Sequence, residues 1–105
     1  GVISVLIQTF FTVEYLFDVH EQSFNPPPKV KSGMIRLLPR TDVPAFASEK
    51  KLFLLVKTAF NQRRKTLRNA VRGLFEPDVL DDPLFDLRAE ALSVEQFAEL
   101  SFRMR

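Results

Sequence analysis

The sequence predicts a mixed α+β chain that is mostly helical, and changes in the period of its apolar residues carry that prediction. At the start, apolar side chains recur at the spacing of one helix face. They are Ile3, Leu6, Ile7, Phe10 and Phe11. From Thr12 the period becomes two, and β-branched or aromatic residues alternate with polar ones, as in a strand. The apolar set is Val13, Tyr15, Phe17 and Val19, and helical spacing returns beyond residue 47.

The two predicted strands cannot form a stable unit by themselves. The first ends near His20, and the second runs from about Val30 to Leu38. The prolines between them cannot donate to a ladder, and a connection of roughly ten residues is long for a hairpin. An isolated two-stranded ribbon is marginal in water. We therefore expect residues 1–38 to be the end of a larger α/β domain.

A linker and a helical unit are expected to follow. Residues 39–47 contain two prolines and predict the linker. In residues 48–105, Ser48 should cap one helix, a second helix should cover about Arg64 to Phe75, and Ser93–Gln96 is a capping box for a third. The residues expected to face inward are Leu52, Leu55, Val56, Ala59, Phe60, Leu67, Ala70, Val71, Leu74, Phe97, Leu100 and Met104.

Composition excludes several classes of site. The chain has no cysteine, which excludes disulfides and thiolate zinc sites and suits a reducing cytosol, so we expect a cytoplasmic protein. No apolar run approaches the roughly 18 residues of a membrane span. Three glycines leave no glycine-rich phosphate loop, and neither His20 nor the aspartates at 78–86 have the spacing of a metal site. We therefore predict no metal, no membrane contact and no catalytic centre within these residues, and we expect the aspartates to lie in an exposed loop.

Charge is divided along the chain. Six Lys or Arg and no acid lie between Lys57 and Arg72, whereas eight acids and one Arg lie between Glu76 and Glu99. Four cations would share an arc of about 100° on the predicted second helix. They are Arg64, Lys65, Arg68 and Arg72. Such a stripe favours phosphate binding, with a solvated helix face or an acidic protein partner as alternatives, and it does not separate RNA from DNA.

The proline loop nearly contains a catalytic motif. Asn25-Pro26-Pro27-Pro28 is close to the Asn-Pro-Pro-aromatic loop of amino-methyltransferases, but its fourth residue is proline. The neighbouring aromatic, Phe24, stands before the prolines. Three interpretations are open from the residues alone: an altered catalytic loop, a different loop of the same class of enzyme, or an ordinary turn in which Phe24 fills the end of the hairpin core.

Three stretches together resemble the KsgA/RsmA family of small-subunit rRNA adenine N6,N6-dimethyltransferases. They are FNPPPKVKSGMIRL (24–37), AFNQRRKTLRNAV (59–71) and LRAEALSVEQFAEL (87–100). The Asn-Gln-Arg-Arg-Lys-Thr-Leu-Arg-Asn run is the most specific. The proline loop is shared with erythromycin-resistance enzymes acting on large-subunit rRNA, which are one alternative. A basic RNA-binding module with no enzyme attached is another.

The resemblance implies a fold and a set of roles. Residues 1–38 would be the last helix and two strands of a Rossmann-like methyltransferase domain, and 48–105 a small all-α rRNA-binding domain. The proline loop would be motif VIII, in which Phe24 stacks on the flipped target adenine. The implied RNA contacts are Lys29, Lys31, Arg63, Arg64, Lys65, Arg68 and Arg72.

The resemblance also implies an activity for the parent enzyme. It would use S-adenosyl-L-methionine to dimethylate two adjacent adenines near the 3′ end of small-subunit rRNA during ribosome biogenesis. The family's glycine-rich cofactor loop, acidic ribose-binding residue and catalytic loop are absent from the 105 residues. We therefore expect these residues alone to bind no cofactor and to transfer no methyl group.

Two kinds of partner are expected. The parent's partner would be small-subunit rRNA in an immature small ribosomal subunit. The 105-residue chain itself should self-associate through residues 1–38, because uncovered strands expose apolar faces and unpaired backbone groups. Residues 48–104 should keep a helical fold of their own.

Overall fold

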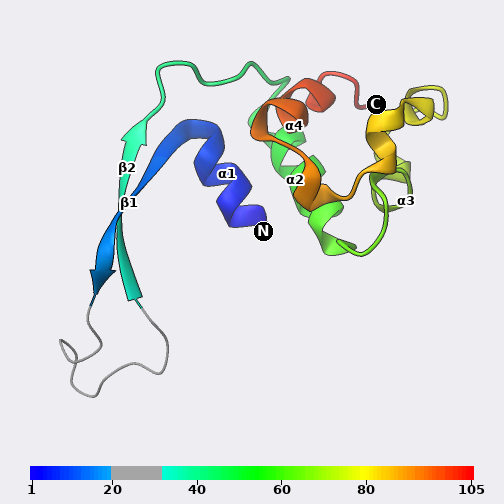
Figure 1. The fold of residues 1–105 in the computed structure, drawn as a ribbon. Helices are drawn as coiled ribbons and strands as arrows, with labels where there is room; N and C mark the ends of the chain where they lie inside the picture. The colour runs from blue at the N-terminus through cyan, green and yellow to red at the C-terminus, as the bar shows by residue number, and fades with distance from the viewer. Residues whose placement is uncertain (20–31) are drawn as a thin grey trace.

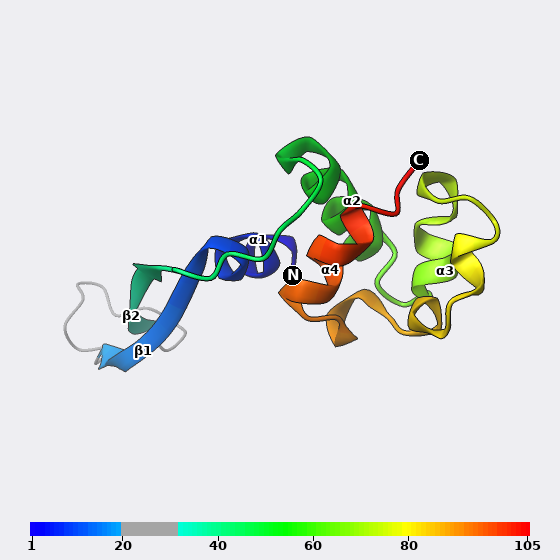
Figure 2. The same cartoon turned by 90° about the horizontal axis from the view of Figure 1, so that it is seen from above.

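The computed structural model describes residues 1–19 and 32–105, in which a two-stranded hairpin projects from a group of short helices (Figures 1 and 2). The elements are α1 (Val2–Phe10), β1 (Phe11–Val19), β2 (Ser32–Pro39), α2 (Glu49–Asn61), α3 (Leu67–Ala70), four 3₁₀ helices η2 (Arg72–Leu74), η3 (Val79–Asp81), η4 (Pro83–Asp86) and η5 (Ala89–Ala91), and α4 (Val94–Ser101). The predicted α+β class is confirmed. No helix in the described ranges is long and apolar enough to cross a bilayer.

The hairpin is exposed on both faces. Its strands pair antiparallel, with Phe11 opposite Pro39 at the base and Val19 opposite Ser32 at the far end. Large apolar side chains are exposed along both strands, so the other described residues do not cover them. They are Val13, Tyr15, Leu16, Phe17, Met34, Ile35, Leu37 and Leu38. The predicted start of the second strand, Val30, lies outside the described residues.

A β-bulge interrupts the regular alternation of β1. Tyr15 pairs with Ile35 and Phe17 with Met34, so Leu16 is one residue too many for the partner strand. The Tyr15 hydroxyl donates to the Asp18 carboxylate, which places these two side chains on the same face although they are three residues apart. The prediction of one regular apolar face from Val13 to Val19 is therefore wrong beyond Leu16, because the extra residue exchanges the faces.

The hydrophobic core lies among the helices of residues 48–105, called here the helical body. Its buried members are Leu52, Leu55, Val56, Ala59, Leu67, Val71, Phe75, Leu80, Phe85, Ala89, Leu92, Phe97 and Leu100. The remaining residues that were predicted to face inward, such as Phe60 and Met104, are partly buried against this cluster. The predicted inward faces are therefore confirmed.

Both predicted helix caps are present. The Ser48 hydroxyl accepts from the Lys51 amide at 3.1 Å, which satisfies one of the free amides at the start of α2. At α4, the Ser93 hydroxyl accepts from the Gln96 amide at 3.1 Å, and the Gln96 side chain accepts from the Ser93 amide at 2.8 Å. These bonds use side chains three residues apart, so they can be predicted from the local sequence.

The predicted second helix, Arg64 to Phe75, is wrong. Residues 62–65 form a turn, α3 has only four residues, and η2 follows with tighter winding. A tertiary contact competes with helical bonding here, since the Leu67 amide donates to the Leu87 carbonyl at 2.8 Å. The turn reverses the chain, so that α3 packs against α2 instead of extending away from it.

The aspartates of Glu76–Leu92, called here the acidic segment, are exposed as expected except for the half-buried Asp82, but the segment is not a simple loop. Leu80, Phe85, Ala89 and Leu92 of this segment belong to the core. Three short 3₁₀ helices alternate with extended residues, so apolar side chains turn inward while most acids stay exposed. The Phe85 ring packs edge-on against Phe75, with centroids 5.0 Å apart.

Helix α1 joins the hairpin to the helical body. Val2, Val5 and Leu6 pack against the core, and α1 contacts both α2 and α4 (Figure 1). The buried Thr9 hydroxyl donates to the Val5 carbonyl at 2.8 Å, so its burial leaves no polar group unsatisfied. Residues 1–10 thus belong to the packing of the helical body, although the sequence groups them with the strands.

Candidate RNA-binding surface

The turn after α2 presents three adjacent cations to solvent. This basic turn, Asn61–Lys65, starts at the last residue of α2, and the backbone leaves the helical region at Gln62. The Lys65 amide donates to the Gln62 carbonyl at 2.9 Å. Arg63, Arg64 and Lys65 are exposed, and none of them forms an ion pair within the described part of the chain. The five residues line a hollow of about 350 Å³. Cations in this arrangement can reach phosphate oxygens without first breaking internal pairs.

Arg68 has a different role from the one that the sequence predicts. Its Nε donates to the Leu80 carbonyl at 2.8 Å, and its guanidinium forms an ion pair with Asp86. A further bond of 3.5 Å reaches the Asp82 carbonyl. Because the acidic segment folds back onto α3, residues distant in sequence neutralise this cation. Arg68 therefore holds the acidic segment against α3.

The predicted four-residue stripe does not exist as one helix face. Arg64 and Lys65 lie in the basic turn, Arg68 is half-buried in α3, and Arg72 is exposed in η2. Arg72 donates to the Asn69 side chain at 2.7 Å and has no ion pair among the described residues. The cations available to an anionic ligand are thus those of the basic turn, together with Arg72.

Four residues singled out from the sequence lie outside the described ranges. Phe24, Lys29, Lys31 and His20 all fall within 20–31. Their predicted roles remain predictions.

The glycines in the described part of the chain are not placed where a ligand would need close approach to the backbone. A side chain at Gly1 or Gly73 would have nothing within 4 Å, so neither glycine marks a close approach of backbone to a ligand. At Gly33 an added Cβ would lie 2.9 Å from the Tyr15 ring, so that space is already filled. Within residues 1–19 and 32–105, no group of three or more His, Asp or Glu side chains could hold a metal ion.

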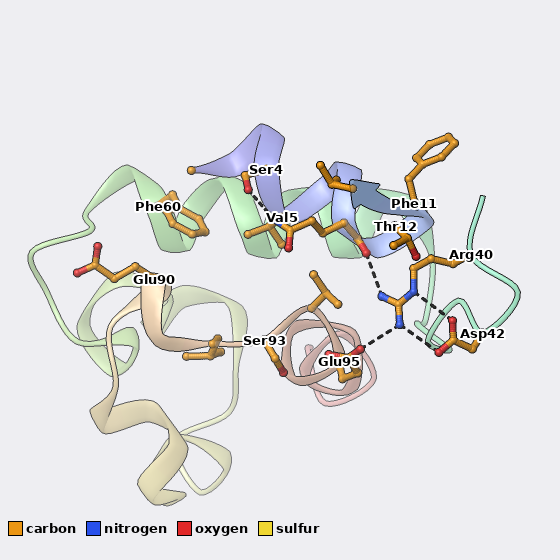
Figure 3. A pocket seen from close by; sticks show the side chains of 15 residues that line it. Ser4, Val5, Phe11, Thr12, Arg40, Asp42, Phe60, Glu90, Ser93 and Glu95 are labelled. Carbon is orange, nitrogen blue, oxygen red and sulfur yellow. Dashed lines mark hydrogen bonds and ion pairs between the residues drawn. The ribbon is translucent and has the colours of Figure 1, made fainter. Parts of the chain in front are cut away.

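A cleft of about 680 Å³ opens where α1, the base of the hairpin and α4 meet, and Arg40 lies at its edge (Figure 3). Sequence reasoning missed this residue. The Arg40 side chain contacts Gln8, Asp42 and Glu95, which come from α1, the linker and α4. The one available signal was an arginine directly after the strand-ending Pro39, with an acid two residues further on.

Arg40 helps to lower the pKa of the two carboxylates that it contacts, Asp42 and Glu95. Hydrogen bonds from the Arg40 guanidinium are the main cause that lowers the pKa of Asp42. The pKa of Glu95 is lowered first by a hydrogen bond from its own backbone amide and then by Arg40. Arg40 therefore favours the charged form of both carboxylates.

Comparisons with known proteins agree with the fold. Residues 1–104 match the family model for ribosomal RNA adenine dimethylase. Ribosomal RNA small subunit methyltransferase A of Phocaeicola vulgatus is 51% identical over 104 residues, which cover 96% of this chain and 37% of that protein. The protein of the same name from Cytophaga hutchinsonii is 52% identical over 104 residues, covering 96% and 40%. A dimethyladenosine transferase from Plasmodium falciparum shares the fold, with a TM-score of 0.77 and 23% identity over 95% of this chain and 46% of that one.

By their names, these relatives are methyltransferases of ribosomal RNA or dimethyladenosine transferases. The chain itself belongs to the ribosomal RNA adenine dimethylase family, as its three motifs predict. It spans 37% and 40% of the length of the two curated relatives named above.

Proposed function

We propose that this chain is the RNA-binding end of an S-adenosylmethionine-dependent enzyme that dimethylates two adjacent adenines near the 3′ end of small-subunit rRNA. The observation that carries the proposal is the basic turn, three exposed cations within a family that acts on ribosomal RNA. Residues 1–38 would close the catalytic domain, 39–47 would link, and 48–105 would bind RNA. The relatives named for the small subunit favour this target over large-subunit rRNA.

The proposal assigns the chemistry to other parts of the parent enzyme. The 105 residues would bind neither S-adenosylmethionine nor a metal, and would transfer no methyl group. Their partner would be the immature small ribosomal subunit in the cytoplasm. In isolation, the chain would instead associate with a second copy through residues 1–38, where its apolar strands are exposed.

Removing two cations from the basic turn should weaken RNA binding and reduce its salt dependence. For Arg63→Ala with Arg64→Ala, we expect the slope of log affinity against log salt to fall by about 1.5, since each lost phosphate contact contributes roughly 0.7–0.9. The measurement is a salt titration with a small-subunit rRNA hairpin and the full 105-residue chain. The control is Lys50→Ala with Arg88→Ala, which removes two exposed cations elsewhere. An equal fall in the control would assign the effect to net charge alone.

In the full-length parent, Phe24→Ala should slow methyl transfer about tenfold to a hundredfold, since stacking on a flipped base contributes roughly 1–3 kcal/mol. Phe24→Tyr keeps an aromatic face and should retain most of the activity. The measurement is methyl transfer to rRNA, with cofactor binding followed in parallel. Loss of cofactor affinity and of the folded state together with activity would instead make Phe24 a core residue.

A further inference from the structure

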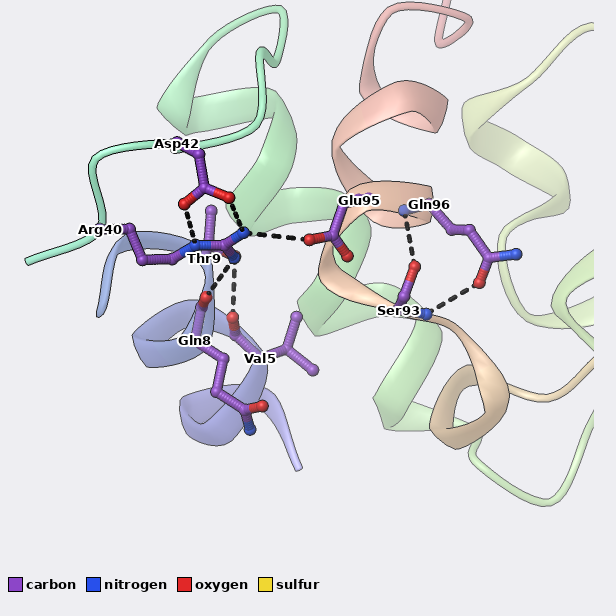
Figure 4. Close-up of polar contacts among 8 residues, drawn as sticks. All are labelled: Val5, Gln8, Thr9, Arg40, Asp42, Ser93, Glu95 and Gln96. Atoms are coloured by element: carbon purple, nitrogen blue, oxygen red, sulfur yellow. Dashed lines mark hydrogen bonds and ion pairs between the residues drawn. The ribbon is translucent and has the colours of Figure 1, made fainter. Parts of the chain in front are cut away.

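We propose that Arg40 is a positioning residue that fixes the angle at which the hairpin projects from the helical body. The residue follows directly after β2, at the joint between the two parts (Figure 4). Its side chain is only 14% exposed, although it is an arginine at the surface. Such burial requires that its donors find partners nearby.

One guanidinium connects three elements. Nη1 donates to the Gln8 carbonyl at 2.9 Å, near the C-terminus of α1. Nη2 donates to Glu95 at 3.1 Å, in the first turn of α4. Nε and Nη2 donate to the two carboxylate oxygens of Asp42, at 3.3 and 3.4 Å. These contacts, called here the Arg40 clasp, tie α1, the linker and α4 to the strand end.

The partners of Arg40 in the clasp carry negative charge or partial negative charge, so they attract a cation. The last carbonyls of a helix have no partner within the helix, and they carry partial negative charge. The Gln8 carbonyl is one of these, and the two carboxylates supply full charges. The Arg40 backbone is fixed as well, because its amide donates to the Phe10 carbonyl at 2.9 Å. Both ends of this residue are therefore anchored to the end of α1.

Directed contacts are needed here because the apolar contacts at the joint do not fix an angle. Phe10 packs edge-on against Phe46, with ring centroids 5.8 Å apart. Apolar burial is non-directional, whereas the guanidinium presents its donors in a rigid planar fork. The strands beyond the joint are exposed on both faces. Among the side-chain contacts described at the joint, the Arg40 clasp is thus the one that can set the direction of the hairpin.

The length of the hairpin makes this angle important. Nine residues of β1 span about 30 Å at roughly 3.3 Å each. A rotation of about 10° at the base would therefore displace the far end by ~5 Å. The distance between that end and the basic turn depends on the clasp.

The test uses spin labels at two introduced cysteines, which are unique because the chain has none of its own. Phe17→Cys marks the far part of the hairpin, and Lys57→Cys marks α2; both positions are exposed. Labelled chain is diluted into unlabelled chain, so that only distances within one molecule contribute to the electron–electron resonance signal. We expect a narrow distance distribution with Arg40 present. Arg40→Met should broaden it clearly, and Arg40→Lys, with one ammonium in place of a fork, should broaden it less.

Two further variants make the result decisive. Glu95→Ala removes the contact from α4 without touching the hairpin, and it should broaden the distribution less than Arg40→Met does, because the bonds to Gln8 and Asp42 remain. Combined with Arg40→Met it should add little, because Arg40→Met already removes the contact with Glu95. Arg103→Met removes an ion pair with Asp82 inside the helical body, and it should leave the distribution unchanged. Unchanged distances in Arg40→Met, or equal broadening in Arg103→Met, would overturn the proposal.

An RNA-binding measurement separates positioning from direct contact. This step rests on the proposed function, whereas the distances do not. Arg40→Met should weaken binding to the rRNA hairpin with its salt slope unchanged, because Arg40 is occupied by internal partners. A reduced slope would make Arg40 a phosphate contact and overturn its positioning role.

Discussion

Phe85→Ala should lower the free energy of unfolding by about 3–5 kcal/mol, the usual cost of truncating a buried phenylalanine. The side chain is fully buried and packs edge-on against Phe75. Truncation loses the burial of the ring and leaves a cavity that the short 3₁₀ helices around it cannot readily close. Small domains are stable by only about 5–15 kcal/mol in total, so this single change should remove a large fraction of the stability of the chain.

Urea unfolding followed by circular dichroism measures this effect. Phe102→Ala is the matched control, because the same side chain is removed where it is 57% exposed. Exposed substitutions usually change stability by less than about 0.5 kcal/mol. If Phe85→Ala were as mild as Phe102→Ala, the acidic segment would not be part of the core.

The second large effect is on association. At micromolar concentration, sedimentation should show the 105-residue chain as a dimer or larger species, because eight large apolar side chains are exposed along two strands whose edges are unpaired. Phe17→Lys with Met34→Glu should convert it to a monomer. These residues lie opposite each other, so the new charges can pair across the strands while opposing addition of another copy.

The charged double substitution tests association more specifically than a deletion of residues 1–38 does. Removing residues 1–38 also removes α1, whose Val2, Val5 and Leu6 cover part of the core. Circular dichroism should show that the charged variant keeps its helices. A monomer before any substitution would contradict the proposal, as would an assembly that persists both in the charged variant and after deletion of residues 1–38.

The parts of the fold that depend on local chemistry could be predicted from the sequence. Helices α2 and α4 begin at the predicted serines, since a cap uses residues three apart. The helix around Leu67 could not be predicted, because its amide bonds to Leu87, twenty residues later. The acidic segment has no sustained period, so its apolar residues gave no sign of burial.

The sequence predicts which cations belong to the candidate RNA-binding surface, but it does not predict how they are arranged in the fold. Exposure of Arg63, Arg64 and Lys65 follows from a run of cations next to a helix end. The role of Arg68 depends on Asp86 and on the Leu80 carbonyl, which only the folded chain brings near. Arg40 escaped notice for the same reason, since its partner Glu95 is 55 residues away.

The bulge at Leu16 gives this strand one position at which its length can change by a single residue. Tyr15 lies opposite Ile35 and Phe17 opposite Met34, so a deletion of Leu16 would leave every pair of the hairpin in register. The side chains beyond it would keep their faces, and Tyr15 and Asp18 would still share one face, now two residues apart. A deletion of one paired residue elsewhere in β1 would instead turn side chains over to the other face. Single-residue length variants of this strand are therefore expected at Leu16.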